Sequence, residues 1–183
     1  KVSVLSHSAE VSGGSILEFT VGGQILKIKI QRGFNFITLD ATTLQIVGIT
    51  KTFDTSNSNE ARDQMIEWLR DLPNLCPSCF VLGGVFEEGS STLNAAAFIQ
   101  LKITLGLRTS SLCFGCSFAF ISQEGGTNLN EVVVMDKTKP AFAKTTTLFG
   151  SFQNQLVTNP RYALKSFLRG MKSSSVPTIT TTE

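Results

Sequence analysis

The sequence is poor in the residues that catalysis most often requires. Its 183 residues include one histidine, one tryptophan and one tyrosine, and the formal net charge is +2. A Ser-His-Asp or Cys-His mechanism would have to use His7, which has no recognisable motif around it. No phosphate loop or nucleophile elbow occurs, and so small a net charge argues against a nucleic-acid binder. The composition predicts a protein that is not an enzyme and needs no cofactor or metal.

Long apolar runs are also missing. The best candidate, around residues 94–107, is too short to span a bilayer and contains Lys102. The chain starts at Lys1 without a charged-then-apolar leader. We therefore expect a mature secreted protein without a transmembrane segment, and a cloned fragment is the alternative. No Asn-x-Ser/Thr acceptor occurs, so glycosylation offers no evidence for secretion.

What the sequence does contain is a set of short apolar segments separated by turn signals. Hydrophobic residues make up 42% and charged residues 16%, which is typical of one globular domain, with or without an appendage. Alternating or apolar runs bounded by Gly pairs and polar turns indicate strands. The predicted strands are residues 2–6, 15–21, 25–30, 34–39, 45–52, 80–86, 112–122 and 131–135.

Two helices are predicted between the later strands. The first has Ser58 or Asn59 as its N-cap and is expected to end at Pro73. The second runs from about Thr92 to Leu105, with Gly106 as a good C-terminal cap. Many strands with two helices favour an α+β fold or a helix-decorated sandwich.

The four cysteines form two C-x-x-C pairs, Cys76/Cys79 and Cys113/Cys116. Such pairs can bind zinc, but residues three apart in a strand point to opposite faces, unless Gly115 marks a bulge. The preferred interpretation is two crossed disulfides that join the loop before Phe80 to the 113–116 segment. Reduced thiols and a zinc site remain the alternatives.

The last part of the chain is predicted to be an appendage, with a helical extension at 136–172 and a flexible Ser/Thr-rich tail at 173–183. Asn159-Pro160 is a strong helix start. One face of the helix that follows is basic and has no acidic residue, which suits an anionic surface or partner. An ordinary surface helix is the alternative. The basic residues are Arg161, Lys165, Arg169 and Lys172.

Several segments in order resemble the GG-domain, or interleukin-like (ILEI), family, which includes secreted cytokines and the stem domain of an O-mannose N-acetylglucosaminyltransferase. The segments are QRGFNFITLD, TKTFDT, VFEEGSSTLN, LKITLG and LCFGCSFAFISQEGG. The resemblance covers about residues 1–131, and we place the domain at 1–135. It implies a twisted antiparallel β-sandwich flanked by helices. It also implies an extracellular, non-catalytic role.

The resemblance further implies where a ligand would bind. Glu87 and Glu88 occupy the loop where family members carry two acids, so we expect a ligand-binding site there that includes Ser90 and Phe114. The glycan-binding member has Arg-Asp where this chain has Gly115-Cys116. A guanidinium donor is therefore missing from that position, which argues against inherited sugar binding.

Three functions follow from these observations. The first is a secreted module that binds an extracellular glycan or protein. The second is a structural protein of an extracellular matrix or mineral-associated scaffold that assembles with copies of itself. The third is a cytokine-like secreted signal.

Overall fold

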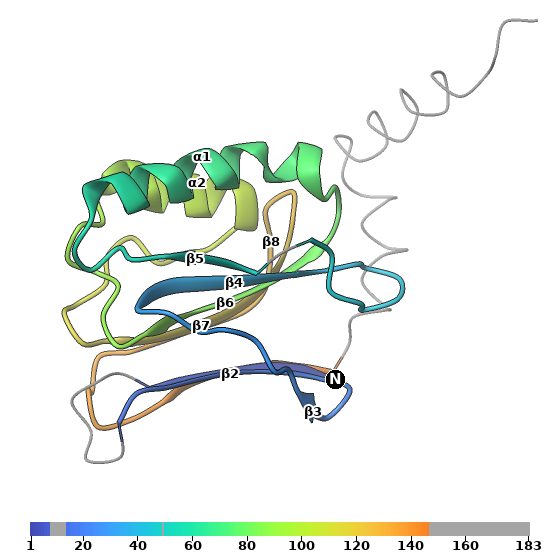
Figure 1. Ribbon diagram of the computed structural model, residues 1–183, viewed down its shortest axis with the longest axis horizontal. Coiled ribbons are helices and arrows are strands. Elements are labelled where there is room, and N and C mark those ends of the chain that lie inside the picture. Colours follow the sequence, from blue (N-terminus) through green and yellow to red (C-terminus); the bar gives the residue numbers. More distant parts are fainter. Residues whose placement is uncertain (8–13, 49, 147–183) are drawn as a thin grey trace, which may run out of the picture. The chain divides into compact units, whose positions relative to one another are not determined.

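The computed structural model describes residues 1–7, 14–48 and 50–146 of the chain. In this part Figure 1 shows three layers, with two helices on top, a five-stranded sheet in the middle and a four-stranded sheet below. The predicted α+β fold of two packed antiparallel sheets with flanking helices is confirmed at this level.

The predicted basic helix, with Arg161, Lys165, Arg169 and Lys172, lies outside the described residues, as does the tail at 173–183. No helix in the described ranges is long and apolar enough to cross a membrane.

The four-stranded sheet has the order β3-β2-β1-β9. Its strands are β1 (Val2–His7), β2 (Ile16–Val21), β3 (Gln24–Ile25) and β9 (Ala141–Thr145). The strand predicted at 25–30 is wrong beyond Ile25. Side chains at 26–30 still alternate between half-buried and exposed, but this stretch leads from the first sheet to the second. Its first residue, Leu26, donates its amide to the Phe19 carbonyl of β2, and residues 27–30 are not part of a strand. Period-two alternation does not distinguish an extended connection from a strand.

The five-stranded sheet has the order β5-β4-β6-β7-β8. Its strands are β4 (Gly33–Leu39), β5 (Lys51–Phe53), β6 (Phe80–Phe86), β7 (Ser117–Gln123) and β8 (Thr127–Val134). Of the strand predicted at 45–52, only its last two residues fall in β5, and Ile46 forms an isolated bridge with Leu39. The predicted strand at 112–122 begins five residues late, because 114–115 form a turn.

The domain boundary expected at residue 135 lies before β9, the last strand in the described part of the chain. β9 pairs with β1 over five positions, and the first compact unit extends from Lys1 to Thr146. Ala141 and Ala143 are fully buried in the sandwich. Residues 136–146 therefore belong to the first compact unit, as β9 and the loop that leads to it, and not to an appendage.

Phenylalanine rings fill the space between the five-stranded sheet and the helices. Phe34 and Phe36 of β4 meet Phe118 and Phe120 of β7, with ring centroids 5.9 Å apart in each cross-strand pair. Gly83 of β6 lies between the two strands, where any side chain would collide with the ring of Phe120. The aromatic core therefore requires a glycine at this position of the central strand.

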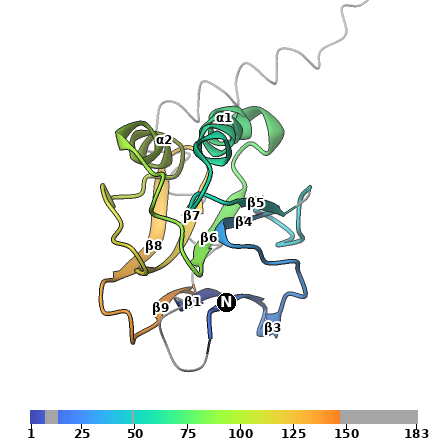
Figure 2. The same ribbon diagram turned by 60° about the vertical axis from the view of Figure 1, so that its left-hand side comes forward.

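The helices α1 (Asn59–Leu75) and α2 (Ala95–Leu105) lie side by side on the outer face of the five-stranded sheet (Figures 1 and 2). Ser58 caps α1 and Gly106 ends α2 in the left-handed conformation, as predicted. Pro73, however, lies inside the last turn of α1 and does not end it. Proline cannot donate to the carbonyl of Leu69, and Thr104 of α2 donates to that carbonyl instead, at 3.1 Å. This contact allows α1 to continue for two more residues.

Candidate functional site

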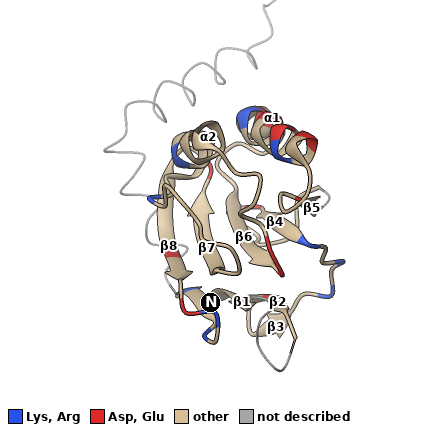
Figure 3. Ribbon diagram, turned by 90° about the vertical axis from the view of Figure 1, so that its left-hand side faces the viewer, with Lys and Arg blue, Asp and Glu red and all other residues tan. Residues whose placement is uncertain are grey.

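The loops at one end of the five-stranded sheet come together although they are far apart in the sequence. Gly33 is opposite Phe86, and Ser117 is opposite Val134. The start of β4, the end of β6, the start of β7 and the end of β8 therefore share one end of the sheet. The acidic loop after β6 is visible there in Figure 3. Loops gathered on a rigid scaffold are a common location for binding residues.

A disulfide closes the turn before β7. Cys113 and Cys116 are bonded, with Cα atoms 5.2 Å apart, and the Cys116 amide donates to the Cys113 carbonyl at 3.1 Å. Gly115 has φ +71°, which suits glycine in such a turn. Cys116 is buried and Cys113 is exposed.

The crossed disulfides preferred from the sequence are therefore wrong. Cys76 and Cys79 are buried free thiols, and burial raises the pKa of both. The prediction placed Cys113 and Cys116 in a strand, where their side chains would point apart. In the structure they lie in a turn, which brings the two sulfurs together. Across the described ranges, no group of three or more His, Cys, Asp or Glu side chains could hold a metal ion, so the zinc alternative gains no support.

Glu88 joins the acidic loop to this turn. One carboxylate oxygen accepts hydrogen bonds from the amide and the hydroxyl of Ser90, the latter at 2.6 Å. The other oxygen accepts from the amide of Gly115. Three donors from two loops thus converge on one carboxylate, and hydrogen bonds to a charged acceptor are stronger than neutral ones. Glu88 positions the loops and has little capacity left for a ligand.

Glu87 is held in a different way. Its φ of +60° is unusual for a residue with a side chain, and such outliers occur often at functional sites. The pKa of the Arg32 guanidinium, just before β4, is raised mainly by a hydrogen bond to Asp54, and the charge of Glu87 adds to this effect. Glu87 and Glu88 therefore have different neighbours, as expected for adjacent residues in a loop.

A guanidinium is present at this end of the sheet after all. Arg32 makes two hydrogen bonds to Asp54, at 2.8 and 3.2 Å, and both side chains are about two-fifths exposed. Arg32 and Asp54 lie in the segments QRGFNFITLD and TKTFDT, which carry the family resemblance, but the resemblance alone does not pair them. The antiparallel register of β4 and β5, in which Phe34 faces Phe53, could have indicated the contact.

Phe114 is the exposed aromatic residue of the disulfide turn. It is 60% exposed, and the ammonium of Lys137 lies 5.3 Å from its ring centroid, a cation–π geometry. Lys137 was not predicted, because nothing local in the sequence links the β8–β9 loop to this turn. We use the name sheet-end surface for Arg32, Asp54, Glu87, Glu88, Ser90, Phe114 and Lys137.

The ion pair of the sheet-end surface predicts a pH dependence. The hydrogen bond from Arg32 lowers the pKa of Asp54, so the contribution of this pair is present above about pH 5 and is lost as the pH falls below about 4. Because the pair is partly exposed, it contributes about 1 kcal/mol or less. Asp54→Asn should be less stable than the wild type at pH 7, and this deficit should be smaller at pH 2.5 in urea unfolding. An equal deficit at both pH values would contradict this assignment.

The sequence of the chain matches a model of a known protein family. The family model described as interleukin-like EMT inducer matches residues 32–126, which is more than half of the chain. The matched segment contains β4 to β7, both helices, and the loops that carry Asp54, Glu88 and Phe114. A search of the curated proteins found no match. The resemblance seen in the sequence is confirmed, and the chain belongs to the interleukin-like EMT inducer family.

Proposed function

We propose that this chain is a secreted, non-catalytic binding domain that recognises an extracellular glycan or protein at its sheet-end surface. The observation that carries the proposal is the convergence on Glu88, which fixes the acidic loop against the turn of Phe114. The two loops fixed in this way present the Phe114 ring, the Glu87 carboxylate and the cations of Arg32 and Lys137 on one surface. These groups are the ones that orient a polar ligand and stack against it.

Several features support binding in preference to catalysis. The Glu88 carboxylate is occupied by three donors, and the Asp54 carboxylate is paired with Arg32. A general acid or base must reach the proton that it transfers, and neither group is placed to do so. Family membership supports an extracellular location. If the ligand is a protein, it would be a receptor, and the chain would then act as a cytokine-like signal.

The alternative of self-assembly through open sheet edges has less support. Of the four edge strands in the described sheets, β3 and β5 are two and three residues long, and short edge strands limit pairing with another chain. The opposite edge strands, β9 and β8, are five and eight residues long, so edge length disfavours pairing at only one side of each sheet. We place recognition before assembly because the exposed aromatic and charged groups gather at the sheet-end surface.

The proposal predicts a surface-specific loss of binding. The variant Glu87→Gln/Phe114→Ala should bind at least about tenfold more weakly than the wild type, because one charged and one aromatic contact are removed. Binding is measured on a glycan array and on the surface of cultured cells with the labelled chain. Ile99→Ala, on the exposed face of α2, is the matched control and should bind normally. Equal binding by both variants, or no saturable binding by the wild type on either support, would contradict the proposal.

A further inference from the structure

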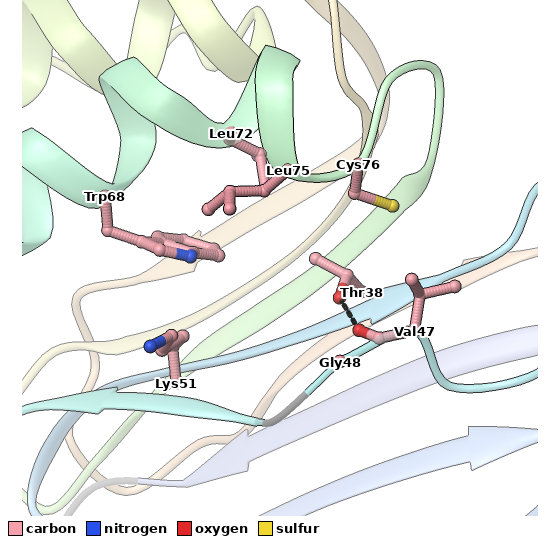
Figure 4. A pocket seen from close by; sticks show the side chains of 8 residues that line it. All are labelled: Thr38, Val47, Gly48, Lys51, Trp68, Leu72, Leu75 and Cys76. Carbon is pink, nitrogen blue, oxygen red and sulfur yellow. Dashed lines mark hydrogen bonds between the residues drawn. The ribbon is translucent and has the colours of Figure 1, made fainter.

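A groove separates α1 from the edge of the five-stranded sheet, toward the end of β4 that is remote from the sheet-end surface (Figure 4). It holds about 310 Å³, at the lower end of the range for small-molecule sites. Side chains of α1 and its C-cap form one wall. The end of β4, the loop that follows it and the start of β5 form the other. The lining residues are Thr38, Val47, Gly48, Lys51, Trp68, Leu72, Leu75 and Cys76.

The helix wall of the groove is apolar and firmly supported. Trp68, Leu72 and Leu75 follow one another at spacings of four and three residues, which places them on one side of α1. The Trp68 ring packs on Phe36 and Phe53, with centroids 4.9 and 5.9 Å away. Leu72 is buried at the base, whereas Leu75 remains 57% exposed at the rim. This wall offers hydrocarbon surface to a ligand and is braced by the core behind it.

The polar atoms of the lining offer little to a polar ligand. The Thr38 hydroxyl already donates to the Val47 carbonyl, the contact that Figure 4 marks with a dashed line. Burial raises the pKa of the Cys76 thiol, and this residue therefore remains protonated and behaves as a small apolar group. The body of a bound molecule must consequently be apolar.

Charge distinguishes the two ends of the groove. Lys51, the exposed first residue of β5, is the one charged residue among the eight that line it. Burial is the main cause of the raised pKa of Cys76, and the charges of Asp40 and Glu124 add to it, so negative potential reaches that end of the groove. An anionic group is thus favoured near Lys51 and disfavoured near Cys76.

We propose that this groove binds a fatty-acid-like carboxylate, with its chain along Trp68 and Leu72 and its carboxylate at Lys51. The apolar wall matches the hydrocarbon chain, and the ammonium matches the head group. This inference concerns a second site and does not depend on the proposed function of the sheet-end surface.

The position of Trp68 supplies the test. It is the only tryptophan in the sequence, so its fluorescence reports occupancy of the groove directly. The full chain is titrated with decanoate, decanol and decyltrimethylammonium, each below its critical micelle concentration. Decanoate should give a saturable change and bind about tenfold more tightly than the cationic amphiphile. Octanoate, which is two methylenes shorter, should bind more weakly by about three- to fourfold per methylene. The reason is that each buried methylene adds to the free energy of transfer from water to the groove.

Charge reversal at the rim locates the head group. Lys51→Glu should weaken decanoate binding about tenfold, whereas Lys102→Glu on the exposed face of α2 should leave it unchanged. The proposal is overturned by an unsaturable signal, by equal affinity for the cationic amphiphile, or by equal effects of the two lysine variants on decanoate binding. A response to anionic vesicles but not to dissolved decanoate would assign the groove to membrane lipid and would likewise overturn it.

Discussion

Replacing Phe36 with alanine is expected to lower the free energy of unfolding by about 3–5 kcal/mol. The ring is 1% exposed and lies within 6.0 Å, centroid to centroid, of four other aromatic rings. These rings belong to β4, β5, β7 and α1. A cavity at this point therefore removes contacts from two layers of the fold at once, and glycine at the facing position of β6 offers no side chain to fill it.

The effect of Phe36→Ala is measured by urea unfolding, with the emission of Trp68 as a second readout. Phe142→Ala is the matched control, because that ring is half exposed on β9 and should cost about 1 kcal/mol or less. Trp68 loses its nearest ring in the variant, so its emission should move toward that of an indole in water. Similar losses of stability for the two phenylalanine variants would contradict the assignment of the core.

Gly33→Ala should cost about 3 kcal/mol or more, although it adds a single methyl group. Gly33 has φ +96°, which disfavours any side chain. A Cβ would also collide with the Phe53 carbonyl oxygen and lie 2.9 Å from the backbone of Asp54. Because Arg32 is the preceding residue, the forced shift should separate its guanidinium from Asp54.

A second glycine isolates the steric part of this effect. Gly23 has a similar φ of +89°, but no atom lies within 4 Å of its virtual Cβ. Gly23→Ala should therefore cost only about 1–2 kcal/mol of backbone strain. Both variants are compared by urea unfolding at pH 7. Equal losses would show that the close approach of β4 to the end of β5 has no energetic effect.

The elements with a strong local signal were predictable from the sequence. The run at Phe80–Phe86 became β6, and the caps at Ser58 and Gly106 define helix ends. The errors arose where distant contacts decide the local structure. Pro73 is tolerated because the Thr104 hydroxyl, from the other described helix, donates to the Leu69 carbonyl in place of the missing proline N–H. Residues 26–30 alternate like a strand because they are extended, yet they cross between sheets.

The candidate site was predictable in part. The sequence and the family resemblance identified Glu87, Glu88, Ser90 and Phe114, and the structure brings the last three together around Gly115. The sequence did not indicate Lys137, because only the folded turn places that residue beside Phe114. The cysteine pairing failed for a related reason. Gly115, with its positive φ, lies in a turn where a strand was expected. The side chains of Cys113 and Cys116 therefore point toward each other and form a disulfide, whereas in a strand they would point apart.

The Cys113–Cys116 bridge closes a loop with a sequence separation of only three. A cross-link this short removes little chain entropy, about 2 kcal/mol, and restrains no pair of distant elements. Both sheets and both helices are held by burial and hydrogen bonds that remain when the two sulfurs are reduced. We therefore expect the scaffold to fold as a dithiol, and later oxidation to stiffen only the turn that carries Phe114.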